Sequence, residues 1–400
     1  MHSLLTLGSS IEYLGRKGTL LFTSLPFLFG WLLMAYSGRM ESPTALLIGR
    51  FITGFCCGLV SLSAPVYIAE TANPSRRGFL GAGFQLAVVI GVLLTYISGK
   101  YVSWAYLAVI NCIFPILLLI GMCLVPETPF WLIKRGRISE ATEANVFLHG
   151  LDAAQHMNVE ISVSSVNSDG LQSESNTLSL KEFRKSHVIR PIVLSLCLMF
   201  FQQFSGVNAL LFYTTTIFTS SGSSSLHPND ATILVGTVQV VATLVACLII
   251  DRAGRKLLLI ISSIGCGLSI LLLSIYHFIG DSKGQDFLHS FSWIPILSLI
   301  CYMIAFSLGL GPMPWLLMGE ILPSHVKSVA SGLCSSFNWM CAFFVTQMFS
   351  NMIDTLHESG TYCLFSIVCF LCSVFVILFL PETKGKSLIE IESLFRPPIN

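Results

Sequence analysis

The sequence predicts an all-α, polytopic membrane protein, and three observations lead to that fold class. Hydrophobic residues make up 54% of the 400-residue chain, whereas charged residues make up only 11%. A typical soluble protein carries about 25% charged residues, more than twice this share. The charges are also clustered, and they leave ten long stretches without any Asp, Glu, Lys or Arg. A soluble core would not repeat such a length ten times.

Each charge-free stretch is long enough to cross a membrane as a helix, because a hydrocarbon core of about 30 Å needs roughly 20 helical residues. Glycine and proline inside these stretches fit membrane helices better than soluble ones. We therefore expect spans over residues 18–38, 51–69, 78–99, 101–126, 191–229, 231–250, 257–280, 287–319, 328–353 and 359–381.

The basic residues lie in alternate loops. Only four of the 22 Lys and Arg fall in the intervening loops, namely Arg39, Arg50, Lys100 and Lys283. Cytoplasmic loops of membrane proteins carry an excess of Lys and Arg. We therefore expect a multi-pass protein whose 127–190 segment and C-terminus are cytoplasmic.

The two halves of the chain repeat one another. Three motifs of the first half recur in the second, displaced by 239, 250 and 255 residues. They are Gly-Arg-Lys at 15–17 and 254–256, a Glu seven residues before a basic residue at 70–77 and 320–327, and Pro-Glu-Thr at 126–128 and 381–383. Two parallel repeats joined by a linker are typical of two-bundle secondary transporters.

The repeats also predict the domain boundaries. The second half contains six charge-free spans and the first contains four. We therefore expect the N-terminal bundle to lack its first span, with its second surviving only as residues 1–11. A Ser-rich stretch near 162–177 predicts a flexible linker. The expected parts are an incomplete bundle at 1–133, a cytoplasmic linker with short helices at 134–189, a six-helix bundle at 190–383 and a cytoplasmic tail at 384–400.

The repeated charged motifs predict an electrostatic latch between the two bundles. Glycine permits a tight turn, and the basic residues after it can meet carboxylates at helix ends. One such motif alone would be explained by ordinary interfacial charges. Because the motifs recur at matched positions, we interpret them as a latch that is closed in one state and broken in another. Its predicted members are Glu12, Arg16, Lys17, Glu70, Arg77, Glu127, Asp251, Arg255, Lys256, Glu320, Lys327 and Glu382.

Amide side chains lie deep inside the predicted spans. Gln202 and Gln203 stand about eight residues, or roughly 12 Å of helix, inside a charge-free stretch. A buried amide is costly unless it is hydrogen-bonded, and it offers both donors and acceptors to hydroxyl groups. A lone Gln more often joins two helices, and Gln347 is assigned that role. The others predict a site for a neutral polyhydroxylated ligand, formed by Gln85, Gln202, Gln203, Asn208, Gln239 and Asn338, with Trp315, Trp339, Tyr213 and Phe306 as aromatic surfaces.

One span is interrupted by the sequence Gly-Leu-Gly-Pro-Met-Pro-Trp at 309–315. Pro312 and Pro314 each remove a backbone donor, and the two glycines allow bending. Such a break is either a packing kink or a discontinuous helix of the kind at which transporters bind and gate. We favour the second interpretation.

These motifs resemble the sugar-porter family of the major facilitator superfamily, and the matches run from Gly8 to the C-terminus. Residues 307–323 are most similar to the trehalose-transporter-like members of insects, and they are also similar to the intracellular class of animal glucose transporters. The resemblance rests on Gly-Arg-Phe at 49–51, Pro-Val-Tyr-Ile-Ala-Glu at 65–70, Pro-Glu-Thr-Pro at 126–129, Gln-Gln-Phe-Ser-Gly-Val-Asn at 202–208, Asp-Arg-Ala-Gly-Arg-Lys at 251–256, Gly-Pro-Met-Pro-Trp at 311–315, Asn-Trp at 338–339 and Pro-Glu-Thr-Lys-Gly at 381–385.

The resemblance implies a major facilitator fold of two pseudo-symmetric bundles that rock around a bound hexose or disaccharide. It implies binding by seven of the residues named above, with Val88 and Val89 lining the pocket. These seven are Gln85, Gln202, Gln203, Asn208, Trp315, Asn338 and Trp339. Gln239, Ser307, Phe212 and Phe130 depart from the residues usual in that family, which leaves the identity of the sugar open.

Three hypotheses remain at this stage. The first is facilitated diffusion of trehalose or a hexose, at the plasma membrane. The second is proton-coupled symport, which needs an intramembrane acid; no acid lies mid-span in this sequence. The third is a truncated, non-transporting sugar-binding form. No metal-ligand spacing, nucleophile elbow or phosphate loop supports an enzyme, and we expect no cofactor, no metal and no nucleic-acid partner beside the sugar and the lipid bilayer. The sequence gives no prediction of oligomeric state.

Overall fold

The computed structural model describes residues 13–73, 76–150, 185–212, 214, 228–323 and 326–395. Every regular element in this part of the chain is a helix. The predicted remnant of a span at 1–11 and the Ser-rich stretch at 162–177 lie outside the described residues, as do Glu12 and Tyr213.

The first group of helices follows the sequence closely. The helices that start at Arg16, Arg77 and Trp104 begin within three residues of the start of a charge-free stretch. The helix that starts at Pro43 begins eight residues before such a stretch, and the helix that starts at Ile113 begins inside one. Ser42 caps one of them by accepting a hydrogen bond from Ala45 N. The group consists of α2 (Arg16–Ser37), α3 (Pro43–Thr71), α4 (Arg77–Tyr101), α5 (Trp104–Asn111) and α6 (Ile113–Leu124).

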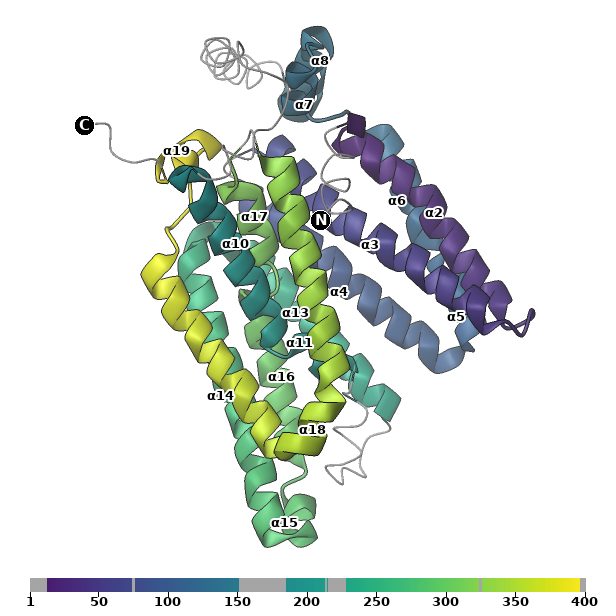
Figure 1. Cartoon of the computed structure of the whole chain (residues 1–400), viewed down its shortest axis with the longest axis vertical. Helices are drawn as coiled ribbons and strands as arrows, with labels where there is room; N and C mark the ends of the chain where they lie inside the picture. The colour runs from purple at the N-terminus through teal and green to yellow at the C-terminus, as the bar shows by residue number, and fades with distance from the viewer. Residues whose placement is uncertain are drawn as a thin grey trace.

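The second group is larger and lies beside the first (Figure 1). Its members pack mainly around α14 and α18. They are α10 (Ser186–Phe204), α11 (Val207–Phe212), α13 (Pro228–Ala253), α14 (Arg255–Lys283), α15 (Gln285–Ser290), α16 (Trp293–Leu308), α17 (Met313–Ile321) and α18 (Lys327–Phe379).

Helix α18 is two spans in one element. It counts 53 residues, and His357 within it has φ 58° and ψ 172°, which is not helical. This kink falls in the gap between the two last charge-free stretches, at 354–358. In Figure 1 the two parts of α18 run in opposite directions from this bend.

Three short helices lie at one end of the molecule (Figure 1): α7 (Pro129–Lys134), α8 (Ile138–His149) and α19 (Leu388–Ser393). Helices α2, α4, α14 and α18 all start at this end, with the basic residues Arg16, Arg77, Arg255 and Lys327. We call it the basic end, and we call the opposite end the far end.

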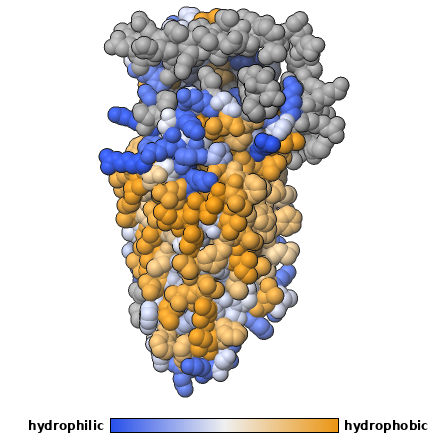
Figure 2. Space-filling view, turned by 90° about the vertical axis from the view of Figure 1, so that its left-hand side faces the viewer, coloured by the Kyte–Doolittle hydropathy of each residue, from blue (hydrophilic) through white to orange (hydrophobic). Residues whose placement is uncertain are grey.

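An apolar surface surrounds the helices between the two ends. Within the described residues, nine helices are long and apolar enough to cross a membrane. Figure 2 shows one side of this surface as a broad orange band with blue residues above and below it. Exposed apolar side chains recur every three or four residues, as expected for lipid-facing helix sides, along α14 at 257, 261, 264, 268, 272 and 275 and along α18 at 364, 367, 371, 374 and 378. The predicted polytopic all-α fold is confirmed.

The two groups of helices touch through few elements. Helix α4 packs along α13, and α3 packs against α17 and against α18. The candidate site lies around these junctions.

Candidate functional site

Four of the predicted amides form a continuous hydrogen-bonded chain at the end of α10. Asn208 Nδ2 donates to Gln203 Oε1 at 2.6 Å, and Gln203 Nε2 donates to Asn338 Oδ1 at 2.9 Å. Asn338 Nδ2 then donates to Gln202 Oε1 at 2.8 Å. The turn between α10 and α11 makes this possible, since Gly206 takes φ 89° and turns the chain so that Asn208 reaches back to Gln203.

The amide chain ends on the broken span. Gln202 Nε2 donates to the carbonyl oxygens of Leu310 and Gly311 at 3.0 and 2.8 Å. Leu310 N donates to Ser262 Oγ at 2.8 Å. In a continuous helix the carbonyl oxygen of Leu310 would accept from the N–H of residue 314. Pro314 has no N–H, so the side chain of Gln202 donates to that carbonyl instead. The predicted break and the predicted amides are therefore one structure.

Gln239 on α13 differs from these four amides in its hydrogen bonding. Its side chain is buried, at 3% exposure, and its Oε1 atom has no hydrogen-bond partner among the described residues. A buried acceptor without a partner costs about 1–3 kcal/mol. A hydroxyl group of a ligand would remove that cost. Gln85 on α4 is buried as well, as is Val89, whereas Val88 is 43% exposed.

The aromatic candidates face both groups of helices. Trp315 on α17 meets Phe84 of α4 with ring centroids 5.8 Å apart. Trp339 on α18 is 46% exposed, and its Nε1 donates to Ser61 Oγ of α3 at 2.9 Å. Phe306 is buried against the broken span, where a Cβ on Gly311 would lie 3.1 Å from its ring. The structure thus unites four amides with the break and leaves Trp339 at the edge of the junction.

The first charged motif forms a compact cluster at the basic end. Glu127 accepts from the backbone N–H groups of Arg16 and Lys17 at 3.1 and 3.0 Å. These N–H groups are unsatisfied donors of the first turn of α2, which attract a carboxylate. Arg16 Nη2 contacts Glu70 Oε1 at 2.7 Å, and both side chains are at most 5% exposed. Gly15, with φ 83°, brings the chain so close to Glu127 that a Cβ would lie 2.2 Å from its Oε2.

The second motif repeats this geometry. Glu382 accepts from Arg255 N and Lys256 N at 3.0 and 3.1 Å, and Gly254 has φ 91°. Arg255 Nη2 lies 3.3 Å from both Glu320 Oε1 and Asp251 Oδ1. Both arginine–glutamate pairs lie within one group of helices, so the pairs themselves do not join the bundles.

Other contacts at the basic end do join them. Asp251 Oδ2 on α13 accepts from Phe79 N at the start of α4 at 3.0 Å. Lys327 interacts electrostatically with Glu70, and Arg77 does so with Glu320. The interactions that cross between the two groups are therefore those of Asp251 with Phe79 N, of Lys327 with Glu70 and of Arg77 with Glu320. The latch itself stays a prediction.

Helix α17 closes the basic end between the bundles. All nine of its residues are buried. Small residues allow its close approach to the first group: a Cβ on Gly81 would lie 2.3 Å from Leu316 Cδ1, and one on Gly319 would lie 2.9 Å from Ala69 Cβ. The amide chain is thus shut off from the basic end.

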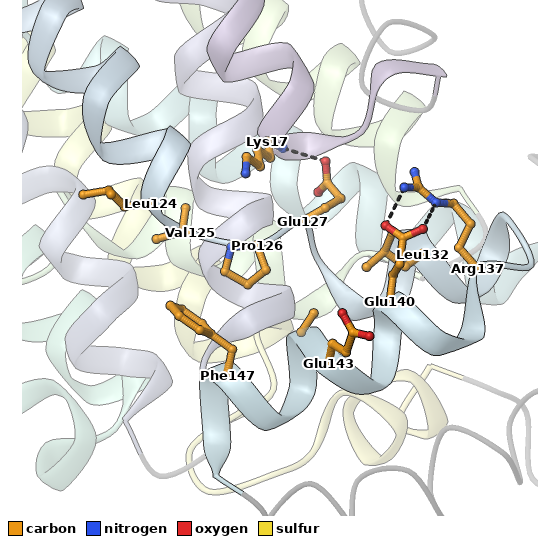
Figure 3. A pocket seen from close by; sticks show the side chains of 11 residues that line it. Lys17, Leu124, Val125, Pro126, Glu127, Leu132, Arg137, Glu140, Glu143 and Phe147 are labelled. Atoms are coloured by element: carbon orange, nitrogen blue, oxygen red, sulfur yellow. Dashed lines mark hydrogen bonds and ion pairs between the residues drawn. The ribbon is translucent and has the colours of Figure 1, made fainter.

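A separate pocket of about 530 Å³ lies between the start of α2, the end of α6 and helices α7 and α8 (Figure 3). In the wall of this pocket Arg137 donates two hydrogen bonds to the carboxylate of Glu140, which makes a bidentate ion pair. The hydrogen bonds that Arg137 donates to Glu140 raise the pKa of Arg137. The residues that line this pocket are charged or apolar, and none of them is an amide. We therefore do not assign the polyhydroxylated ligand to it.

Sequence reasoning missed several contacts of the site. The hydroxyl groups of Ser61 and Ser335 lie 3.1 Å apart across α3 and α18. Thr383 Oγ1 donates to Glu320 Oε2 at 2.7 Å. Lys100 and Asp230 pair at the far end. Serine and threonine are frequent in membrane helices, so no pattern singled these out.

Two groups of membrane helices around a buried amide chain, with duplicated charged clusters at one end, define a two-bundle secondary transporter. The family model of the "Sugar (and other) transporter" matches residues 1–395, and the chain belongs to that family. Members named among its relatives are transporters, which agrees with the prediction that the protein is not an enzyme.

Two curated relatives carry the name facilitated trehalose transporter Tret1. That of Apis mellifera ligustica is 42% identical over 400 residues, which cover 98% of this chain and 76% of that protein. That of Drosophila mojavensis is 42% identical over 385 residues, which cover 96% of this chain but only 44% of that protein. The chain therefore spans less than half the length of the fly relative.

Solved structures agree on the major facilitator fold. The proton:xylose symporter XylE bound to 6-bromo-6-deoxy-D-glucose matches with a TM-score of 0.84 at 26% identity, over 98% of this chain and 87% of that chain. The inward open conformation of XylE from E. coli, with the same coverage, gives 0.68 at 25% identity.

Proposed function

We propose that this chain moves a neutral sugar, trehalose or a hexose, across a membrane by facilitated diffusion with alternating access. One observation carries the proposal: a chain of buried amides ends on the broken span, close to the junction of the two helix groups. Gln239 supports it, because its buried Oε1 atom has no hydrogen-bond partner among the described residues and a sugar hydroxyl would supply one.

The chemistry of the amides suits sugar hydroxyls. Each hydroxyl both donates and accepts a hydrogen bond, and so does each amide. A sugar can therefore replace the amide–amide bonds one by one without leaving a buried polar atom unpaired. Trp315 would present an apolar ring face beside them. Trehalose is the sugar named for the curated relatives, and we propose it or a hexose here.

The proposed orientation places the basic end in the cytoplasm, at the plasma membrane, with the helix groups at 1–133 and 190–383 as the two moving bundles. The structure would then be the form closed to the cytoplasm. Opening requires α17 to leave α3 and α4, and it requires Asp251 to release Phe79 N. The latch members listed above are then the residues that set the balance between the two forms.

Uptake of radiolabelled trehalose and glucose into vesicles that contain the 400-residue chain tests the proposal, with and without a pH gradient. Equilibration that ignores the gradient is expected. Accumulation driven by the gradient would show proton-coupled symport instead, and binding without flux would show a non-transporting form.

Gln239→Met gives the sharper test of the site. The substitution keeps the side-chain shape but removes the unpaired acceptor, so thermal stability without sugar should stay equal or rise. The half-saturation concentration for sugar should increase about tenfold, the loss of one hydrogen bond to a buried group. Gln347→Met is the matched control, because that amide is exposed and should leave both values unchanged. An unchanged half-saturation in the Gln239 variant would remove this residue from the site.

A further inference from the structure

Helices α4 and α13 form the longest junction between the two groups, and they lie side by side in Figure 1. Their approach is close along the middle, since a Cβ on Gly236 would lie 3.2 Å from Leu93 Cδ1 and 3.4 Å from Tyr96 Cδ2. Polar contacts join these helices at both ends of the pair. Phe79 N donates to Asp251 Oδ2 at the basic end, and Lys100 Nζ pairs with Asp230 at the far end.

The distance between the two contacts along the helices is close to the thickness of a membrane. On α4, 21 residues separate Phe79 from Lys100, and on α13, 21 residues separate Asp230 from Asp251. At 1.5 Å per residue this is about 31 Å, close to the thickness of a hydrocarbon core, about 30 Å. The antiparallel helix pair is therefore held at both membrane surfaces in register.

The far-end pair is built from the ends of both helices. Lys100 lies in the last turn of α4, and Asp230 lies in the first turn of α13. Each charge also complements the dipole of its own helix, a cation at a C-terminus and an anion at an N-terminus. The two side chains are 31% and 41% exposed, so water and salt reach them.

We propose that Lys100 and Asp230 form a far-end latch that must break when the bundles part on that side. The inference rests on the alternating access proposed above, but not on the identity of the sugar. Rocking of the two bundles separates α4 from α13 at one end at a time, so each opening breaks one of the two polar contacts. The Asp251 contact resists opening at the basic end, and the Lys100–Asp230 pair resists opening at the far end.

The latch is weak by construction. Ion pairs between exposed side chains contribute little, so losing one should change the ratio of open to closed forms by at most about fivefold. A weak latch suits a transporter, because a strong one would hold the cycle in a single state.

Hydrogen–deuterium exchange of the full chain in lipid nanodiscs, without sugar, tests the latch independently of transport. The variants are Lys100→Gln, Asp230→Asn, both together, and the swap of Lys100→Asp with Asp230→Lys. Lys283→Gln is the control, because Lys283 is an exposed cation at the same end of the molecule on α14 and contacts Phe287 of its own bundle.

We expect exchange in 93–101 and 230–237 to rise by up to about fivefold in each single variant. The double variant should exchange no faster than the single ones. The swap should exchange more slowly than the double variant, because it restores the ion pair, but faster than the original protein, because each charge then opposes the dipole of its own helix. The proposal is overturned if the single variants exchange at the original rate or if their effects add in the double variant. It is also overturned if the swap exchanges no more slowly than the double variant, or if exchange rises equally in the Lys283→Gln control. Changed exchange without any sugar uptake would support the latch and remove the proposed function.

Discussion

The two charged clusters at the basic end have the same backbone arrangement but different side-chain connections. In both, a glycine of positive φ starts a helix, and a glutamate from a Pro-Glu-Thr motif accepts from the next two N–H groups at 3.0–3.1 Å. The copies lie 239 residues apart in the sequence. The start of a helix explains why both clusters share this arrangement, because its free N–H groups need a hydrogen-bond acceptor.

The difference lies in the buried glutamates. Glu70 has one hydrogen-bonded partner, Arg16, and its Oε2 has none in the described part of the chain. Glu320 has both oxygens engaged, by Arg255 and by Thr383. The second cluster is also the one whose Asp251 reaches across to α4. The turn is thus the same in both clusters, while the connections to the rest of the molecule differ, and in the first cluster Arg16 alone supplies the hydrogen bond to the buried glutamate.

The largest effect should follow from breaking that ion pair. Arg16→Met keeps the buried length of the side chain but removes the hydrogen-bonded partner of Glu70, which leaves this buried carboxylate with only its electrostatic interaction with Lys327. Loss of one partner of a buried pair costs about 3–5 kcal/mol. Arg255→Met should cost less, because Glu320 keeps its bond from Thr383. The thermal unfolding midpoint in detergent measures both, and the Arg16 variant should unfold at the lower temperature.

Arg137→Met serves as the control for that comparison, since its pair with Glu140 is about half exposed and should contribute nothing measurable. Equal midpoints for the Arg16 and Arg255 variants would mean that the two clusters are energetically equivalent despite their different connections.

A smaller effect should separate the two glycines. An Ala at either position would be forced into the left-handed region, at φ 83° or 91°, which costs about 1–2 kcal/mol. Gly15→Ala should cost more than Gly254→Ala, because its Cβ would lie 2.2 Å from the glutamate oxygen rather than 2.8 Å. Midpoints from the same unfolding assay test the order, and the reverse order would show that the carboxylates move freely.

The fold could be predicted from the sequence because the membrane imposes it. Charge-free stretches located the described spans, and the gap at 354–358 located the bend of α18 at His357. No other regular structure satisfies backbone groups in lipid as simply as a helix does. The described spans therefore needed no knowledge of tertiary contacts.

The site could be predicted only as a set of residues. The amides and the break at 309–315 were both visible, but the bonds from Gln202 to Leu310 and Gly311 were not, since they depend on which carbonyls the break leaves free. Likewise the sequence marked Glu127 as a partner of basic side chains, whereas it binds their backbone N–H groups. Lys100 and Asp230 lie 130 residues apart in the sequence. Neither belongs to a motif that is repeated in the two halves, so the sequence did not predict that they pair.

The smallest effect should come from Thr383→Val, which converts the second cluster into the connectivity of the first. The substitution conserves shape and removes only the hydroxyl that donates to Glu320 Oε2. Because Arg255 remains in place, the cost should be about 1 kcal/mol, that of one hydrogen bond to a buried acceptor. In the Thr383→Val background, Arg255→Met should then become as destabilising as Arg16→Met, since Glu320 would have lost both of its hydrogen-bonded partners. If the shifts of the unfolding midpoint in the two single variants simply add in the double variant, Thr383 and Arg255 stabilise Glu320 independently. The difference in stability between the two clusters would then have to come from Asp251.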